Sequence, residues 1–265
     1  MSTDYTLAYG THATPEDGRC AMEWVSHLAG ELHGDEPACV SPVVRAFCVA
    51  LNDGLEDRPR QRLRPYLVRT IGTTGDGLDT QRAWWAMDWL IRTYTPTWLS
   101  LADLSDAADR LRQLPEVAMA TDLRGALEAL GCARKHARTE LRAGPSRWRA
   151  PSLSARMVAR ELAWATGAPA AWAAARAGVG DLAGDRARAM ARAAAGDAAA
   201  AVARTARASV DRAGAVAAVR AALAATREEL QDSAIALLDR MLPLVPVPMP
   251  AVEVGRDLRL IYAPT

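Results

Sequence analysis

Hydrophobic residues recur every three to four positions through the first half of the chain, which is the spacing of amphipathic helices. The pattern predicts helices at about 14–33, 42–54, 58–71, 80–94, from 103 or 105 to 114, and 121–143. Two start signals are clear, because Thr14-Pro15 and Ser41-Pro42 each place a hydroxyl N-cap before a proline at the first helical position. Pro65 is expected to kink or split the third helix.

Composition rather than periodicity indicates helix beyond a linker at 145–153. Alanine, the best intrinsic helix former, supplies 33 of the 75 residues from 151 to 225. Gly-Asp pairs at 180–181, 184–185 and 196–197 are each expected to end one helix and cap the next. A long helix, either continuous or interrupted at Gly214, should then run from 197 to 242, before four prolines between 243 and 250 impose an extended strap.

The predicted fold class is all-α: a multi-helix bundle or array with an Ala/Arg-rich helical back portion and a short C-terminal extended or hairpin tail. Three portions follow along the chain, which either separate or pack as one domain. They are a polar front helical module (1–144), an Ala/Arg-rich helical portion (154–242), and a Pro-rich strap and tail (243–265).

Charge is distributed unevenly, although the net charge is only +1. Residues 1–133 carry a net charge of −7 and residues 134–227 a net charge of +11. Such a chain is expected to pair its halves internally, to self-associate, or to present a basic face to an anion. Arginine accounts for 31 of the 32 basic residues, a bias that a GC-rich genome would also produce.

The four cysteines form no CxxC pair, and no apolar run approaches the roughly 18 residues of a membrane span. No charged-then-apolar leader opens the sequence. These features predict a cytoplasmic protein with reduced thiols and no membrane partner.

A polar stripe along the first predicted helix holds residues that suit a divalent metal or thiol chemistry. Its members fall at spacings of three, four and four, and two further candidates follow: Cys20, Glu23, His27 and Glu31, then His33 and Cys39. Carboxylate, imidazole and thiolate are the usual ligands of zinc. The metal candidates are Glu23, His27, Glu31, His33 and Cys39, and the catalytic candidates are Cys20, Glu23 and His27. The alternative is a solvated helix face around a buried thiol.

A basic cluster close to the middle of the chain is the second candidate site. Its anion-binding or nucleic-acid-binding candidates are Arg134, Lys135, Arg138, Arg142, Arg147, Trp148 and Arg149. Arginines on a helix bind phosphates, and a nearby tryptophan can stack on a base. The alternative is a solvated face that pairs with the acidic front portion.

Residues 12–99 also resemble an uncharacterised family of hypothetical proteins from actinobacteria and their phages. The resemblance rests on Asp17 through Glu23, Ala29 through Glu31, Asp35 through Pro42, and Asn52-Asp53. It covers about a third of the chain and implies a front module that stands beside variable alanine-rich portions. It assigns no activity to any residue.

Three functions follow from these features. The leading one is a non-enzymatic helical interaction, adaptor or assembly protein, which would bind a protein partner or itself. The second is a metal- or thiol-dependent enzyme that uses the stripe from Cys20 to Cys39. The third is nucleic-acid binding through the Arg-rich segment 134–149.

Overall fold

The computed structural model describes residues 5–142, 153–205 and 212–243, and within these ranges it holds helices and no strand. In chain order the elements are η1 (Pro15–Asp17), α1 (Ala21–Ala29), α2 (Pro42–Gly54), α3 (Asp57–Arg60), η2 (Gln61–Leu63), α4 (Arg64–Thr70), α5 (Asp79–Trp89), η3 (Leu90–Tyr94), α6 (Thr95–Leu101), α7 (Ser105–Arg112), η4 (Ala120–Asp122), α8 (Leu123–Arg142), α9 (Leu153–Trp164), α10 (Ala168–Gly178), α11 (Leu182–Thr205) and α12 (Arg212–Met241). The prediction of an all-α helical array is confirmed. The predicted linker 145–153 lies almost wholly outside the described residues, as do the strap and tail beyond Pro243.

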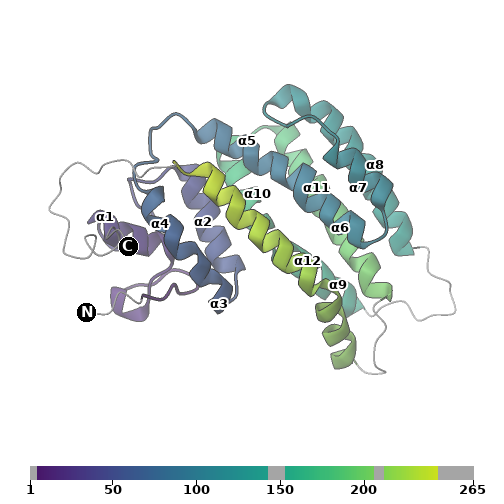
Figure 1. Cartoon of the computed structure of the whole chain (residues 1–265), viewed down its shortest axis with the longest axis horizontal. Coiled ribbons are helices and arrows are strands. Elements are labelled where there is room, and N and C mark those ends of the chain that lie inside the picture. Colours follow the sequence, from purple (N-terminus) through teal and green to yellow (C-terminus); the bar gives the residue numbers. More distant parts are fainter. Residues whose placement is uncertain (1–4, 143–152, 206–211, 244–265) are drawn as a thin grey trace, which may run out of the picture.

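The helices form an elongated array in which α1 to α4 gather at one end and α6, α7, α8 and α11 at the other (Figure 1). Helix α10 packs between α2 and α5, while α11 packs against α6, α8 and α9. Helix α12 runs along the array and contacts both groups. One buried apolar cluster extends from Leu7 to Leu242 through all these layers. The boundaries proposed for separate domains stay a prediction.

Alanine sets the spacing of the helices around α11. From Ala194 to Ala201 the alanines of α11 are buried, and they face buried alanines of α8 and α9, including Ala133, Ala137 and Ala159. Methyl groups let helix axes approach closely, although each buries little apolar area. The approach brings neighbouring helices against the backbone of α11.

A π-helical turn, η3, joins α5 to α6 where these helices pass α11. Pro96 explains this turn, because it has no N–H to donate to the carbonyl four residues earlier and its ring would clash with that carbonyl. The Thr95 hydroxyl instead donates to the Leu90 carbonyl at 2.7 Å. The wider turn places Tyr94 against α11, where it is 1% exposed.

Several predicted helix boundaries were wrong. The start proposed at Thr14-Pro15 gives only the short turn η1, which stops at Gly18 with φ of 129°, and α1 begins at Ala21. This helix ends at Ala29 rather than near residue 33, because Gly30 takes a left-handed conformation with φ of 72°. The Gly-Asp pairs at 184–185 and 196–197 lie inside α11 and do not interrupt it. Surrounding alanines favour the continuous helix there. The single helix predicted from 197 to 242 is therefore wrong, because this range belongs to two helices, α11 and α12. The pair at 180–181 does separate α10 from α11, and the Asp181 carboxylate accepts from the Gly184 N–H at 2.6 Å.

Ion pairs and caps tie α12 to the front portion. Arg227 of α12 contacts Glu56 of the front portion at 3.5 Å, which agrees with an acidic front portion and a basic back portion. In a second pair the charges are reversed, because Arg62 of the front portion contacts Asp232 of α12 at 2.6 Å. The buried Arg82 donates to the Met241 carbonyl at 2.9 Å and so satisfies the end of the helix. Exposed ion pairs contribute only about 0–1 kcal/mol each, so apolar packing provides most of the docking energy.

No described helix combines the length and apolarity that crossing a lipid bilayer requires.

Candidate anion-binding site

Three arginines form a stripe along the last turns of α8. Arg134, Arg138 and Arg142 follow one another at intervals of four residues, which places them on one face of the helix about 6 Å apart along its axis. The adjacent face carries Ala133, Ala137 and other buried apolar residues that pack on α11. The apolar face thus fixes the rotation of α8 and leaves the arginines exposed along its edge.

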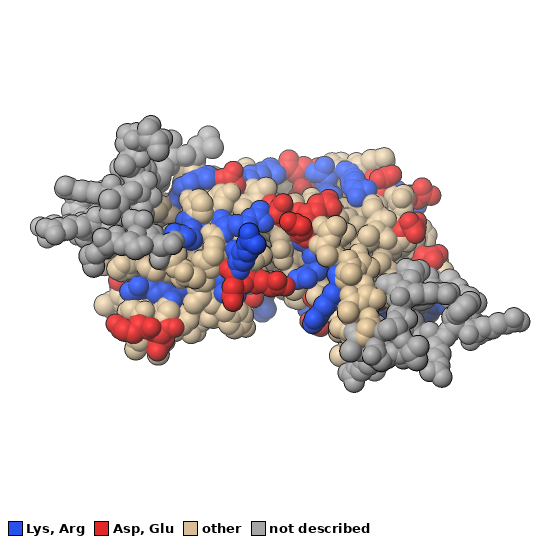
Figure 2. All heavy atoms as spheres, turned by 60° about the horizontal axis from the view of Figure 1, so that its bottom comes forward, with Lys and Arg blue, Asp and Glu red and all other residues tan. Residues whose placement is uncertain are grey.

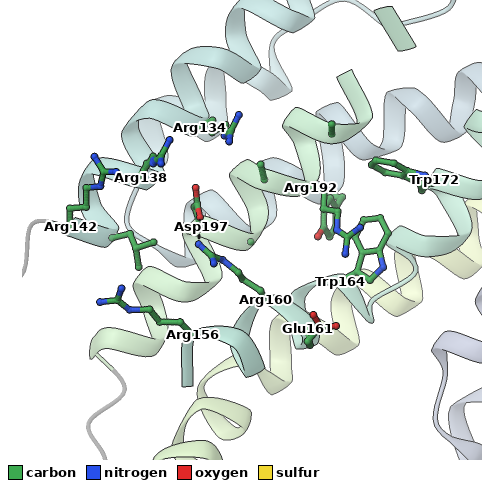
Figure 3. A pocket seen from close by; sticks show the side chains of 15 residues that line it. Arg134, Arg138, Arg142, Arg156, Arg160, Glu161, Trp164, Trp172, Arg192 and Asp197 are labelled. Atoms are coloured by element: carbon green, nitrogen blue, oxygen red, sulfur yellow. Dashed lines mark hydrogen bonds and ion pairs between the residues drawn. The ribbon is translucent and has the colours of Figure 1, made fainter. Parts of the chain in front are cut away.

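A second stripe, on α9, repeats the same interval. Arg156, Arg160 and Trp164 are each four residues apart, while Ala155, Ala159 and Ala163 turn into the core. Because α8 and α9 both pack on α11, the two stripes border a common groove (Figure 3).

The floor of this groove is the surface of α11, where side chains are small. Ala189, Ala193 and Gly196 line it, together with Arg192 and Asp197. At Gly196 an added Cβ would lie at ordinary contact distance, 3.4 Å from Cγ of Arg160, so the stem of that arginine lies against α11. The groove encloses about 680 Å³, a volume in the range of small-molecule sites.

We call this feature the arginine groove and define it by the residues that line it: Tyr94, Arg134, Arg138, Leu141, Arg142, Arg156, Arg160, Glu161, Trp164, Trp172, Ala189, Arg192, Ala193, Gly196 and Asp197. Six guanidinium groups face two carboxylates, a local excess of four positive charges. Such an excess in a partly enclosed space attracts anions.

Few of these arginines are neutralised within the protein. Arg160 binds Asp197 at 2.5 Å, and among the described residues no other arginine of the groove forms an ion pair. The Nε atom of Arg156 is buried and has no hydrogen-bond partner within the described part of the chain. A buried donor without a partner is costly.

Aromatic side chains close one end of the groove. The guanidinium of Arg192 lies 4.1 Å from the ring centre of Trp164, and Trp172 meets Trp164 edge to face at 5.5 Å. The buried Tyr94 also lines the groove, and burial raises the pKa of its hydroxyl while the charge of Arg192 lowers it. The net effect is a raised pKa, so this tyrosine stays neutral at physiological pH.

The basic cluster predicted from the sequence contributes half of the groove's arginines. Arg134, Arg138 and Arg142 line it, whereas Lys135 is exposed on another side of α8. Arg147, Trp148 and Arg149 lie outside the described residues.

Sequence reasoning missed the other half of the groove: Arg156, Arg160, Trp164, Trp172 and Arg192. The four-residue interval of Arg156, Arg160 and Trp164 matches that on α8 and could have indicated a second stripe. Nothing in the sequence placed the two stripes opposite each other.

The polar stripe of the first helix is arranged differently from the prediction. Glu23 is 1% exposed and accepts hydrogen bonds from the Cys20 N–H at 2.7 Å, the His12 N–H at 2.6 Å and the His12 ring at 2.8 Å. Burial would raise the Glu23 pKa, but these hydrogen bonds outweigh it and the pKa is lowered. Glu23 therefore holds the segment before α1 against the start of that helix.

The remaining candidates of the stripe point to separate partners. Glu31 follows the end of α1 and accepts from the N–H groups of Ala38 and Cys39 at 2.6 and 3.0 Å. The Nε2–H of His33 donates to the His12 carbonyl oxygen at 3.0 Å, and the same Nε2 lies 4.0 Å from a carboxylate oxygen of Glu23. His27 is exposed and meets the edge of Trp24.

The predicted metal ligands therefore meet in pairs and not as one set: His33 lies beside Glu23, and Glu31 accepts from the backbone N–H of Cys39. Across the ranges that the structure describes, no three side chains among His, Cys, Asp and Glu are grouped as ligands for one metal ion. Burial raises the pKa of the Cys20 and Cys39 thiols to about 12. Both thiols are therefore protonated at neutral pH, which is the unreactive form.

Comparison of the chain with models of protein families, with curated proteins and with solved structures finds no match.

Proposed function

We propose that the protein binds single-stranded nucleic acid in the arginine groove. The observation that carries this proposal is the convergence of six arginines from α8, α9 and α11 on one groove, only one of them paired with a carboxylate among the described residues. A guanidinium stays charged at all physiological pH values and binds phosphate oxygens through two parallel hydrogen bonds.

The placement of these arginines favours a ligand that binds inside the groove over one that binds on the open surface of the protein. On the face shown in Figure 2, basic and acidic side chains are interspersed over the described part of the molecule. The arginine groove instead gathers basic side chains with two carboxylates, of which Asp197 is already paired with Arg160. A ligand with several negative charges in a row would fit this distribution.

The width of the groove favours a single strand over a duplex. The axes of packed helices are about 8–10 Å apart, so the axes of two helices that both pack on a third are at most about 16–20 Å apart. Subtracting one helix diameter of about 10–12 Å leaves a gap of less than about 10 Å between the surfaces of α8 and α9. A duplex, whose major groove alone is about 12 Å wide, is too broad, whereas one strand fits between the two stripes.

Stacking groups accompany the positive charge, as in other sites for single strands. Proteins that bind single strands without sequence preference combine a basic groove with aromatic or guanidinium platforms for the bases. Trp164, Trp172 and Arg192 supply such platforms at one end of the groove. The interaction-protein function stays a prediction.

The proposal is tested by fluorescence anisotropy with a labelled single-stranded oligonucleotide of about ten nucleotides, a length within the usual range of 4–16 per site. Charge reversal in the groove, Arg138→Glu with Arg142→Glu, should abolish binding. The matched control, Arg124→Glu with Lys135→Glu, makes the same change in charge on exposed positions of α8 outside the groove. An equal loss of oligonucleotide affinity in the groove variant and the control variant would contradict the proposal, as would the absence of binding by the unaltered protein.

A further inference from the structure

The arginine groove has two chemically different ends (Figure 3). At one end lie four arginines that form no ion pair among the described residues: Arg134, Arg138, Arg142 and Arg156. At the other lie Trp164, Trp172 and Arg192, with Glu161 nearby. We call these the phosphate end and the aromatic end.

Negative charge marks where the phosphate end stops. The Arg160–Asp197 pair sits between the two ends, so the charge of Arg160 is already neutralised there. Glu161 belongs to the aromatic end, and its carboxylate would repel a phosphate placed beside it. A strand whose phosphates follow the four unpaired arginines would therefore bring something other than phosphate to the aromatic end.

At the aromatic end, Arg192 contacts Trp164 and can also contact a ligand in the groove. Trp164 and Trp172 meet edge to face, and the Cζ atom of Arg192 lies over the Trp164 ring, 4.1 Å from its centre. Arg192 is exposed and lines the groove, so its guanidinium is accessible to a ligand there. Bases stack on guanidinium planes as they do on aromatic rings.

From this layout we infer that the aromatic end binds one nucleobase, stacked on the groove-side face of Arg192. The adjoining phosphates of the same strand lie among the arginines of the phosphate end. Glu161 accepts a hydrogen bond from an exocyclic amino group of that base, as carboxylates do from cytosine N4. This inference rests on the proposed function and adds that the ligand is recognised by a base as well as by its charge.

The experiment compares two strands with equal charge. One is an oligo(dC) of about ten nucleotides, and the other is an abasic strand of the same length with the same number of phosphates. Stacking of a base contributes about tenfold or more in affinity, so oligo(dC) should bind at least about tenfold more tightly than the abasic strand.

Variants that keep the charge separate stacking from electrostatics. Arg192→Lys retains the positive charge but removes the planar guanidinium, so it should erase most of the preference for oligo(dC) and leave binding of the abasic strand nearly unchanged. The matched control, Arg138→Lys at the phosphate end, should lower the affinity for both strands by the same factor.

Each outcome separates the inference from the proposed function. Equal affinity for the two strands, with both weakened by the Arg138→Glu, Arg142→Glu variant, would overturn the base site and leave nucleic-acid binding in place. A preference for oligo(dC) that survives Arg192→Lys would also overturn it. Absence of binding to either strand would refute the proposed function and the inference together.

Discussion

The salt dependence of binding measures how many arginines of the groove contact phosphates. Binding of a single strand releases condensed counterions, and the logarithm of the association constant falls by about 0.7 for each neutralised phosphate per unit of log salt. If the four arginines of the phosphate end each neutralise one phosphate, the slope is about −2.8. Raising salt from about 50 to about 200 mM should then weaken binding about 50-fold.

Removing two of these arginines should halve that slope. Arg138→Gln with Arg142→Gln leaves two phosphate contacts, a slope of about −1.4 and only about a sevenfold loss over the same salt range. Neither arginine has a hydrogen bond or ion pair to another described residue, and both are exposed on α8. The substitutions should therefore leave the stability of the fold almost unchanged.

Anisotropy titrations at four or five salt concentrations, with the unaltered protein and both variants, give the slopes directly. Arg124→Gln with Lys135→Gln serves as the control, because it removes two charges from the same helix outside the groove. That control should keep the slope near −2.8. A slope that is the same in the groove variant and in the unaltered protein would refute the argument, as would an equal reduction in the control.

Three further predictions concern the fold. Glu23→Gln should lower the free energy of unfolding by about 3 kcal/mol in denaturant titrations, because buried N–H groups lose a charged acceptor. Since the Glu23 pKa is lowered, its stabilisation should be present above the unfolded-state pKa of about 4.3 and disappear as the pH falls further. The prediction would be contradicted if the free energy of unfolding of Glu23→Gln fell with decreasing pH as it does in the unaltered protein. In a thiol-reagent assay at about pH 8, the exposed Cys132 should react rapidly, whereas Cys20 and Cys48, whose pKa burial raises to about 12, should react only on unfolding. Gly178→Ala should destabilise the protein by about 1–3 kcal/mol in thermal unfolding, because its Cβ would lie 2.4 Å from that of a neighbouring alanine, whereas the same change at Gly180, which has open space around it, should not.

Local signals in the sequence were sufficient for most helices of the front portion. Ser41 accepts from the N–H groups of Val43 and Val44 and starts α2 as its N-cap pattern predicted. Pro65 lies at the second position of α4, so the chain divides near it, as expected. These features depend on contacts within a few residues, which is why the sequence alone reveals them.

The candidate site depended on contacts that the sequence does not contain. The three arginines of α8 could be found from their interval, but their partners on α9 and α11 come to them only through the packing of alanine faces. Glu23 misled the prediction for a related reason. Its position three residues after Cys20 fits a surface stripe equally well, and only the fold of residues 5–12 over α1 makes it a buried acceptor.

The alanine floor of the arginine groove has a practical consequence for mapping the site. Alanine scanning identifies a binding surface by removing side chains, and it cannot register Ala189 or Ala193, where there is nothing to remove. What these two positions contribute to the groove is the space that their small side chains leave open. Adding bulk, for example with Ala193→Leu, fills the groove without altering its charge and would show whether a ligand reaches the floor of α11.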